Sequence, residues 1–364
     1  MGERLFVNIE KQVGKFRLAL NLRIGSEVLV LFGPSGAGKT QSLNVIAGLV
    51  TPDRGEIRLD GEILFGRDPT GKFINVATRL RRTAMVFQHF ALFPHLTARE
   101  NILFGVRRRA SLPNQADQIL SRMRLNGLAD RYPHELSGGE QQRVAIARAL
   151  AADSRVLLLD EPFSALDRPT RELLHQELRL LQEEKELVII YVTHSLEDAL
   201  VAGNRIGIIN QGRVEQVSSV EELFRRPKSR AVLEILGLPN IIEAIIVGDH
   251  HLEWYGTQLY IPELRQKVSD SEGKGVSIVC YISAEEVEVS LPGATKEEWA
   301  AANVPNLFRG SVEGVHTTGF SHRIKIRLSN GKLIEALVRN NGKYNRGDQV
   351  EVKIPGNRLV FVQN

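Results

Sequence analysis

Near its N-terminus the chain carries an unbroken run of Gly33, Pro34, Ser35, Gly36, Ala37, Gly38, Lys39 and Thr40. The run fits the phosphate-binding loop, in which two glycines frame four residues ahead of lysine and serine or threonine. Glycines let the backbone approach phosphates closely, so that successive N–H groups form a nest for anions. The helix that follows adds the positive end of its dipole. The run therefore predicts a binding site for a nucleoside triphosphate.

Two side chains of this loop have predicted roles of their own. Lys39 supplies a mobile positive charge for the β- and γ-phosphates, and the Thr40 hydroxyl is a predicted ligand of Mg²⁺. The flanks fit, because residues 27–32 form a short apolar run typical of a buried strand and apolar residues recur at helical spacing over 43–49. The alternative is a chance glycine turn beside a surface lysine, and only companion motifs exclude it.

The composition is that of a soluble globular protein with room for two domains. The formal charge of +4 is mild and does not support nucleic-acid binding, and the basic run 107–109 is interpreted as solvated surface. The single cysteine, Cys280, excludes an intramolecular disulfide and lies in an apolar run that predicts a buried strand. No apolar stretch approaches the roughly eighteen residues of a membrane span, and no secretory signal is recognisable. We therefore expect a cytoplasmic protein that meets a membrane only through a partner.

The chain divides into two regions that differ in their predicted secondary structure. From residue 1 to about 235, short β-branched runs alternate with helical patterns, which predicts an α/β domain. Residues 155–160 and 187–192 are predicted to be strands buried on both faces. Residues 170–186, between them, carry leucines on one stripe among charges and predict an amphipathic helix.

The second region, residues 236–364, alternates apolar and polar residues in short runs, apart from a helical stretch near 296–302. One hairpin is explicit, because Asn330-Gly331 joins two alternating runs and favours a tight turn. Several short strands in such a length predict a small β-barrel or a pair of barrels, with its core at about 304–364.

Two further groups of residues carry chemistry. Asp160 and Glu161 end a buried strand, and the carboxyl ends of parallel strands lie beside a phosphate loop. We therefore expect Asp160 to hold Mg²⁺ and Glu161 to act as general base. Ser137, Gly138 and Gly139 lead into a helix and predict a second anion site. Both groups also have a structural interpretation. An acidic pair at the end of a strand often caps a helix, and Ser-x-x-Glu forms a capping box. A capping box does not, however, account for the doubled glycine.

In this order, the motifs resemble those of the ATPase subunit of an ATP-binding-cassette transporter. The resemblance rests on the phosphate loop, on Leu-Ser-Gly-Gly-Glu at 136–140 and on Val-Leu-Leu-Leu-Asp-Glu-Pro at 156–162. It implies ATP as the nucleotide and Mg²⁺ as its metal.

The resemblance also implies roles for four further residues. Gln88 touches Mg²⁺ and the attacking water and senses the membrane partner. His194 contacts the γ-phosphate, and Asp167 lies in the loop that faces the opposite subunit. Phe16 is the candidate for stacking on the adenine.

The resemblance implies a fold and partners as well. The fold is a P-loop α/β ATPase domain with a helical subdomain, residues 1–235, followed by an all-β barrel of TOBE or Mop type with an OB-like fold, residues 236–364. Two copies of the chain pair head to tail, so that each ATP lies between the phosphate loop of one copy and residues 137–139 of the other. The dimer drives integral membrane permease subunits at the cytoplasmic face of the inner membrane. A solute-binding protein delivers the cargo.

Local phrases favour molybdate or tungstate as the cargo. His194-Ser195 and residues 32–40 are similar to the molybdate group of importers, and the tail at 305–362 is similar to the barrel of oxyanion, iron and polyamine importers. The loop 316–322, rich in serine, threonine and histidine, is a candidate oxyanion site, with an ordinary polar loop as the alternative. Sulfate, ferric iron and polyamines are the alternative cargoes.

Two other classes of function are open. Soluble cassette ATPases that work on ribosomes or DNA carry tandem cassettes or long heptad coils, and this chain has neither. A pure binding module with an inactive cassette is disfavoured, because Lys39, Asp160, Glu161 and His194 are all present.

Overall fold

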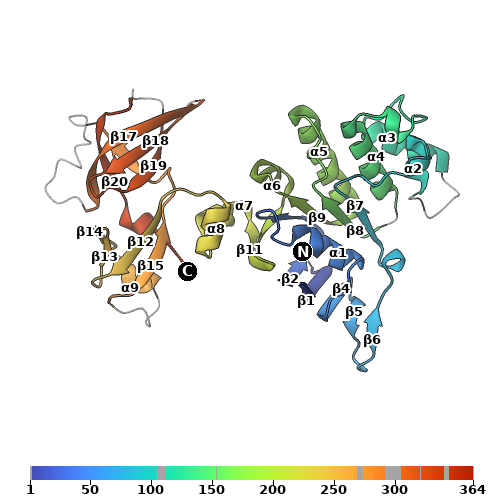
Figure 1. Cartoon of the computed structure of the whole chain (residues 1–364), viewed down its shortest axis with the longest axis horizontal. Helices are drawn as coiled ribbons and strands as arrows, with labels where there is room; N and C mark the ends of the chain where they lie inside the picture. The colour runs from blue at the N-terminus through green and yellow to red at the C-terminus, as the bar shows by residue number, and fades with distance from the viewer. Residues whose placement is uncertain are drawn as a thin grey trace. The chain divides into compact units, whose positions relative to one another are not determined.

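A computed structural model describes residues 2–104, 106, 112–152, 154–268, 274–291, 305–319, 321–339 and 344–363. Its contacts divide the chain into two compact units, Met1–Leu223 and Phe224–Asn364. Figure 1 shows that one unit combines a large sheet with helices, whereas the other consists mainly of strands. The basic run 107–109 and the helical stretch predicted near 296–302 lie outside the described residues. Within these residues, no helix combines the length and the apolar character needed to cross a membrane.

A mixed sheet of eleven strands forms the centre of the first unit. In spatial order its strands are β6 (Phe73–Asn75), β5 (Glu62–Arg67), β4 (Arg54–Leu59), β1 (Leu5–Val13), β2 (Phe16–Ile24), β11 (Arg213–Ser219), β10 (Arg205–Asn210), β3 (Val28–Phe32), β9 (Val188–Thr193), β8 (Val156–Asp160) and β7 (Thr83–Val86). The strands from β10 to β7 pair in parallel, whereas β4, β1 and β2 pair antiparallel. Every residue of β3, β8 and β9 is buried, which confirms the predicted strands.

Helices of two kinds accompany this sheet. Their bounds are α1 (Lys39–Ala47), α2 (Ala98–Phe104), α3 (Leu112–Arg122), α4 (Gly138–Ala151), α5 (Arg168–Lys185), α6 (Leu196–Ala202) and α7 (Val220–Arg225). Helix α1 packs on the central strands, whereas α2, α3 and α4 pack on one another and form a helical subdomain (Figure 1). Helix α5 is the predicted amphipathic helix, with Leu174, Leu178 and Leu181 buried and Leu173 left partly exposed.

Helix α1 is shorter than the sequence predicts. It ends at Ala47, because Gly48 takes a left-handed φ of +81° and caps the helix. The apolar periodicity continues to Leu49, but this residue lies beyond the cap and is 50 % exposed. Glycine just after a helix is a frequent stop signal, and here it prevails over the apolar pattern.

A buried arginine fastens the end of α1. Arg81 is only 1 % exposed, and its Nη1 donates to the carbonyl oxygens of Val45 (3.1 Å) and Ile46 (3.0 Å). Its remaining donors reach the Val76 carbonyl (2.9 Å) and Asn75 Oδ1 (3.0 Å). Burial lowers the pKa of Arg81. The cation therefore lies at the negative end of the helix dipole. It satisfies the Ile46 carbonyl, which has no partner within the helix, and it is a second donor to the Val45 carbonyl, which also accepts from the Gly48 N–H at 3.1 Å.

Among its described residues, the second unit contains two antiparallel sheets of five strands and two short α-helices. One sheet has the order β14 (Thr257–Tyr260), β13 (His251–Trp254), β12 (Ile241–Ile246), β15 (Ser277–Tyr281) and β21 (Val360–Val362). The other has the order β16 (Glu288–Ser290), β20 (Gln349–Lys353), β17 (Leu307–Thr318), β18 (Ser321–Leu328) and β19 (Leu333–Arg339). The helices are α8 (Arg230–Ile235) and α9 (Leu264–Lys267).

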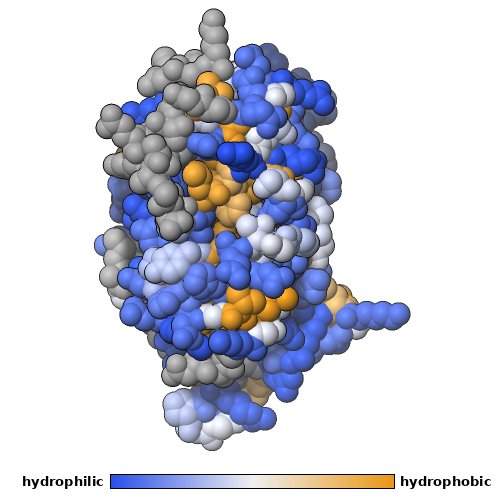
Figure 2. Space-filling model, turned by 90° about the vertical axis from the view of Figure 1, so that its left-hand side faces the viewer, coloured by the Kyte–Doolittle hydropathy of each residue, from blue (hydrophilic) through white to orange (hydrophobic). Residues whose placement is uncertain are grey.

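Apolar residues of both sheets form one hydrophobic cluster, so the second unit has a single core. Cys280 is buried in β15, and strands β18 and β19 form the hairpin around Asn330-Gly331, so both predictions are confirmed. Figure 2 shows a mostly hydrophilic face of the molecule that is interrupted by apolar patches.

The boundary between the units differs from the prediction. The sequence predicts a division after residue 235, whereas the contacts divide the chain after Leu223. The reason lies at the C-terminus, because Arg230 N–H donates to the Gln363 carbonyl and Gln363 N–H donates to the Lys228 carbonyl, each at 3.0 Å. This pairing spans more than a hundred residues and attaches the segment around α8 to the second unit.

The capping role of Arg81 can be tested by substitution. Arg81→Met keeps an apolar stem but removes the donors, so we expect the free energy of unfolding to fall by about 2–3 kcal/mol, the usual cost of buried acceptors without partners. Urea denaturation followed by circular dichroism measures the change. The control is Arg82→Met at the exposed neighbouring residue, for which we expect less than about 0.5 kcal/mol. Equal losses in both variants would contradict the capping role.

Candidate active site

The phosphate loop joins the carboxyl end of β3 to the start of α1. Gly36 and Gly38 have φ values of +78° and +103°, a region that favours glycine. A Cβ atom on Gly33 would lie 2.1 Å from the carbonyl oxygen of Ile209, so the backbone itself excludes a side chain there. The backbone path of the loop therefore depends on all three glycines.

The Lys39 ammonium folds back over this loop. Its Nζ donates to the carbonyl oxygens of Gly33 (2.8 Å) and Pro34 (2.9 Å), and the residue is 7 % exposed. Burial lowers the pKa of Lys39, although the nearby carboxylates of Glu161 and Asp160 act in the opposite direction. The ammonium charge is thus held by neutral carbonyl oxygens, and the negative charge of a bound anion would attract it away from them.

Thr40 and Asp160 come together beneath the loop. Thr40 Oγ1 donates to Asp160 Oδ1 at 3.1 Å, and Asp160 is 4 % exposed. Burial raises the pKa of Asp160, against the opposing effect of the Thr40 hydrogen bond. A buried carboxylate beside a hydroxyl is an oxygen donor set that suits Mg²⁺, which usually binds few protein groups and completes its shell with phosphate and water. These two residues therefore fit the predicted metal.

Glu161 and His194 meet at the same edge of the sheet. His194 Nδ1 lies 2.8 Å from Glu161 Oε1, and the two residues follow the neighbouring strands β8 and β9. Glu161 has a φ of +48°, a left-handed value that costs a non-glycine residue about 1–3 kcal/mol. Its N–H donates to the Val192 carbonyl (3.0 Å), and its carbonyl accepts from Ser164 Oγ (3.1 Å). The surroundings therefore impose the backbone that presents this carboxylate.

Gln88 lies exposed two residues beyond Val86, the last residue of β7. Val86 pairs with Leu159, so β7 ends beside the end of β8, and Gln88 and Glu161 both follow at the same edge of the sheet. Among the described residues, its side chain makes no hydrogen bond. The structure thus places Gln88 at the predicted edge of the sheet without fixing its amide.

Phe16 packs against the phosphate loop at the turn between β1 and β2. A Cβ atom on Gly38 would lie 2.8 Å from the tip of the Phe16 ring, and one on Gly212 would lie 3.0 Å from it. The predicted adenine-stacking residue is therefore beside the loop. Both glycines have a positive φ, +103° at Gly38 and +80° at Gly212, and a Cβ atom on Gly212 would also lie 2.0 Å from the Arg17 carbonyl oxygen.

The doubled glycine before α4 has two different environments. Ser137 caps the helix, because its Oγ accepts from the Glu140 N–H while its own N–H donates to Glu140 Oε2 at 2.7 Å. A Cβ atom on Gly139 would lie 2.8 Å from Leu166, whereas one on Gly138 would meet nothing within 4 Å. A side chain at Gly139 would therefore require the Leu166 side chain to move, whereas nothing within the chain restricts Gly138.

Asp167 caps helix α5, since its Oδ1 accepts from the Thr170 N–H at 2.8 Å. The hydrogen bond to Thr170 lowers the pKa of Asp167. Asp167 therefore caps a helix of its own chain, as Ser137 does, and capping is the alternative to a contact with a facing subunit at both residues.

Sequence reasoning missed a buried network behind these loops. Arg171 donates to the Leu166 carbonyl (3.0 Å) and to Asp198 Oδ1 (3.2 Å), and so joins the loop before α5 to helix α6. His175 Nε2 lies 3.7 Å from the same carboxylate oxygen. Burial acts to raise the pKa of Asp198, but His175 and Arg171 together hold it below its usual value. No local pattern signals this network, because its members are separated along the chain.

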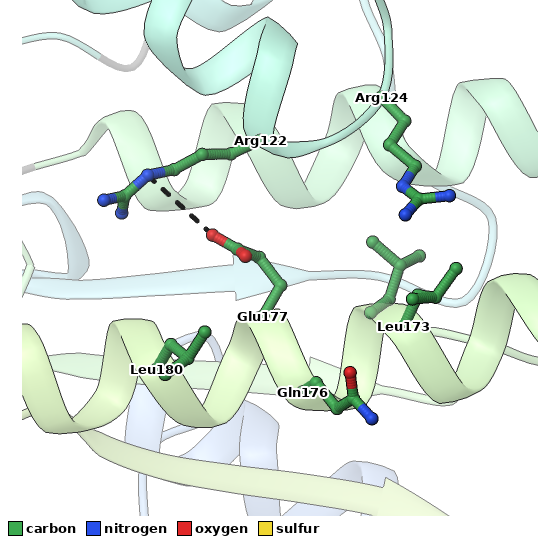
Figure 3. A pocket seen from close by; sticks show the side chains of 7 residues that line it. Arg122, Arg124, Leu173, Gln176, Glu177 and Leu180 are labelled. Carbon is green, nitrogen blue, oxygen red and sulfur yellow. Dashed lines mark ion pairs between the residues drawn. The ribbon is translucent and has the colours of Figure 1, made fainter.

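The other candidate sites are less developed. In the loop 316–322, Thr317 Oγ1 lies 2.9 Å from His322 Nδ1, so these two groups satisfy each other. A cavity of about 130 Å³ lies between the helices drawn in Figure 3, where the dashed line joins Arg122 to Glu177. Arg122 Nε lies 3.8 Å from Glu177 Oε1. The lining of the cavity contains no predicted site residue and consists of Arg122, Arg124, Leu173, Leu174, Gln176, Glu177 and Leu180.

Comparisons with known proteins give relatives along the whole chain. The profile of the ABC transporter family matches residues 17–164, and that of the TOBE domain matches residues 282–362. The sulfate/thiosulfate import ATP-binding protein CysA of Nitrosomonas europaea is 37 % identical, over 95 % of this chain and 94 % of that protein. The spermidine/putrescine import ATP-binding protein PotA 1 of Pseudomonas aeruginosa is 36 % identical, over 87 % of this chain and 83 % of that protein. Among solved structures, a dimeric post-hydrolysis state of the ATP-binding cassette MJ0796 bound to ADP and Pi is 35 % identical. The match has a TM-score of 0.52 and covers 59 % of this chain and 98 % of that one.

The Arg171–Asp198 pair makes a prediction for stability and its pH dependence. Arg171→Met leaves a buried carboxylate short of one cation, so we expect a loss of about 2 kcal/mol at neutral pH. Because the pKa of Asp198 is lowered by folding, its contribution is present above the pKa of an unfolded aspartate and is lost as pH falls through the lower folded value. The difference between parent and variant in denaturation experiments should therefore shrink at acidic pH. The control is Arg168→Met, which changes an exposed arginine of the same helix. A loss of stability in Arg171→Met that does not depend on pH would contradict the role of the Arg171–Asp198 pair.

Proposed function

Because the chain belongs to the ATP-binding subunits of ABC transporters, we propose that it hydrolyses ATP to energise solute import through permease subunits in a membrane. One observation carries the proposal. A single edge of the sheet gathers the phosphate loop, the buried Thr40–Asp160 pair and the Glu161–His194 pair. These are an anion cradle, a set of metal ligands and an acid–base pair, the groups that phosphoryl transfer to water needs.

The chain's own residues supply binding and proton transfer in this proposal. The loop N–H groups and Lys39 hold the phosphates, and Phe16 contacts the adenine. Thr40, Asp160 and Gln88 would hold Mg²⁺, which when bound neutralises the charge of the β- and γ-phosphates.

Glu161 is the proposed general base. A water oxygen attacks the γ-phosphorus, the bond between that phosphorus and the β–γ bridging oxygen breaks, and the Glu161 carboxylate takes the proton of the water. Contact with His194 uses one carboxylate oxygen, Oε1, and leaves the other for the water. His194 and Gln88 are proposed to orient the γ-phosphate and the water, respectively.

A second copy of the chain completes the site in our proposal. Gly138 stands at the exposed start of α4, where a side chain would meet nothing of its own chain within 4 Å, so this end of the helix is open to an outside ligand. The helix N-terminus beside Ser137 favours an anion. We therefore propose that Ser137, Gly138, Gly139 and Asp167 contact the ATP held by the facing copy. The MJ0796 structure, a dimeric post-hydrolysis state bound to ADP and Pi, supports this arrangement.

Exposed aromatic residues near Gln88 are the proposed docking site of the permease. Phe87 is 37 % exposed and Phe104 66 % exposed, and the rings of Phe93 and Phe104 lie 4.4 Å apart. Apolar surface next to a catalytic loop is suited to receive a partner that controls turnover. Docking there would hold the chain at the cytoplasmic face of the membrane, with a solute-binding protein delivering cargo on the other side.

We propose sulfate or thiosulfate as the cargo, in place of the molybdate that the sequence favours. The support is the name of the relative that covers nearly the whole chain, a sulfate/thiosulfate import protein. Ser195, part of the phrase that favoured molybdate, caps helix α6 by accepting from the Asp198 N–H at 3.2 Å, a role without relation to cargo. Polyamines are the alternative, since another relative is a spermidine/putrescine import protein. An oxyanion site at the loop 316–322 stays a prediction.

The role of Glu161 predicts the behaviour of Glu161→Gln. Glutamine keeps the shape and a partner for His194 but cannot accept a proton, so we expect phosphate release to fall at least about 100-fold while ATP binding is retained. Rates of phosphate release and titration with a fluorescent ATP analogue measure the two properties. The control is Glu172→Gln, at an exposed glutamate on α5, which should leave the rate unchanged. Unchanged hydrolysis in Glu161→Gln would remove the proposed base.

The cargo can be identified in a reconstituted system. The chain is combined with its permease and solute-binding protein in vesicles, and ATPase rates are compared with sulfate, thiosulfate, molybdate, ferric iron and spermidine. We expect stimulation by sulfate or thiosulfate. Stimulation by molybdate, iron or spermidine alone would contradict the proposed cargo and leave the importer function intact.

A further inference from the structure

The turn after Gln88 contains two consecutive residues in a left-handed conformation. Phe90 and Ala91 have φ values of +60° and +48°, which residues other than glycine adopt only where the surroundings impose them. Within the turn, Phe90 N–H donates to the Phe87 carbonyl (2.9 Å) and Ala91 N–H donates to the His89 carbonyl (2.6 Å). These local bonds pull the chain into a tight loop, so the left-handed pair needs support from elsewhere.

Arg148 supplies that support from helix α4. Its Nη2 donates to the Phe90 carbonyl at 3.0 Å, and its Nη1 donates to the Ala91 carbonyl at 2.8 Å. Its guanidinium carbon lies 5.4 Å from the centroid of the Phe93 ring. Burial lowers the pKa of Arg148. The planar guanidinium donates to two successive carbonyls while it lies against an aromatic ring. Lysine cannot reproduce this arrangement, because its ammonium group is not planar and has no forked pair of donors.

We propose that Arg148 is a positioning residue that clamps this turn and thereby sets the place of Gln88 at the active site. The inference rests on the proposed function, because Gln88 matters only if the site hydrolyses ATP. It adds to that function a mechanical link between the two halves of the site.

The link runs along helix α4. The helix begins at Gly138, beside the groups that we propose for the facing ATP, and Arg148 lies ten residues further along the same rod, about 15 Å away. A shift of α4 at the facing ATP therefore reaches the carbonyls of Phe90 and Ala91. If the fork loses these carbonyls, the strained turn relaxes and Gln88 leaves the edge of the sheet that it shares with Glu161. The rate of hydrolysis thus depends on the position of helix α4.

A pair of substitutions separates the clamp from mere packing. Arg148→Met keeps the apolar stem and removes the fork, and we expect kcat to fall about tenfold with the Kd for ATP within about twofold, since the phosphate loop is untouched. Ala91→Gly removes the left-handed penalty, because glycine adopts positive φ freely. In the Arg148→Met background it should recover at least about threefold of kcat, and in the parent it should change kcat by less than about twofold.

The control for the rescue is Arg124→Gly. Arg124 also has a left-handed φ, +53°, but it lies on the surface beyond α3, so glycine there should not restore Arg148→Met. Arg148→Lys should resemble Arg148→Met, because a single ammonium cannot hold both carbonyls in the same plane. An unchanged kcat in Arg148→Met, or a loss that Ala91→Gly does not reduce, would overturn the proposal.

A stability cycle tests the clamp without any catalysis. Free energies of unfolding are measured for the parent, Arg148→Met, Ala91→Gly and the double variant. We expect the midpoint of urea denaturation to shift less on Arg148→Met when residue 91 is glycine, and additive shifts would overturn the clamp. Failure of the proposed function has a different signature, since the parent would then release no phosphate while the cycle still showed coupling.

Discussion

The parallel pairing of β3, β8 and β9 is the constraint on which the rest of the molecule depends. Phe32 pairs with Thr193, and Asp160 pairs with Val192, so the three strands end at the same level. Every residue in these strands is buried, and only the centre of a sheet covered on both faces can accommodate them. Their common end brings together the phosphate loop, the acidic pair and His194, although these lie far apart in the sequence.

Much of the fold could be predicted because its signals are local. The prediction of a P-loop ATPase domain with a helical subdomain, followed by an all-β TOBE-type barrel domain, is confirmed. Buried strands are continuous apolar runs, and Asn330-Gly331 specifies its hairpin within a few residues. The domain boundary could not be predicted in the same way. It depends on pairing between Arg230 and Gln363, and no local pattern carries a contact of that span.

The site shows a similar division between local and distant signals. The sequence motifs predict Lys39, Asp160 and Glu161 as site residues, the family resemblance adds His194, and the structure brings all four to one edge. The arginines that hold the loops were missed, because their partners are backbone carbonyls or a carboxylate elsewhere in the chain. Of the two adjacent glycines, only Gly139 lies close to another part of its own chain, the Leu166 side chain. Nothing within the chain restricts Gly138, the position at which we propose a contact with the facing copy.

In our proposal, each ATP site is completed by another copy of the chain. The most direct test is the molar mass of Glu161→Gln in solution, measured by light scattering with and without ATP and Mg²⁺. We expect nucleotide to double the mass, and we expect Ser137→Arg in the same chain to prevent the doubling by placing a bulky side chain at the facing contact. A mass that does not respond to ATP, or a doubling that Ser137→Arg leaves intact, would contradict the claim.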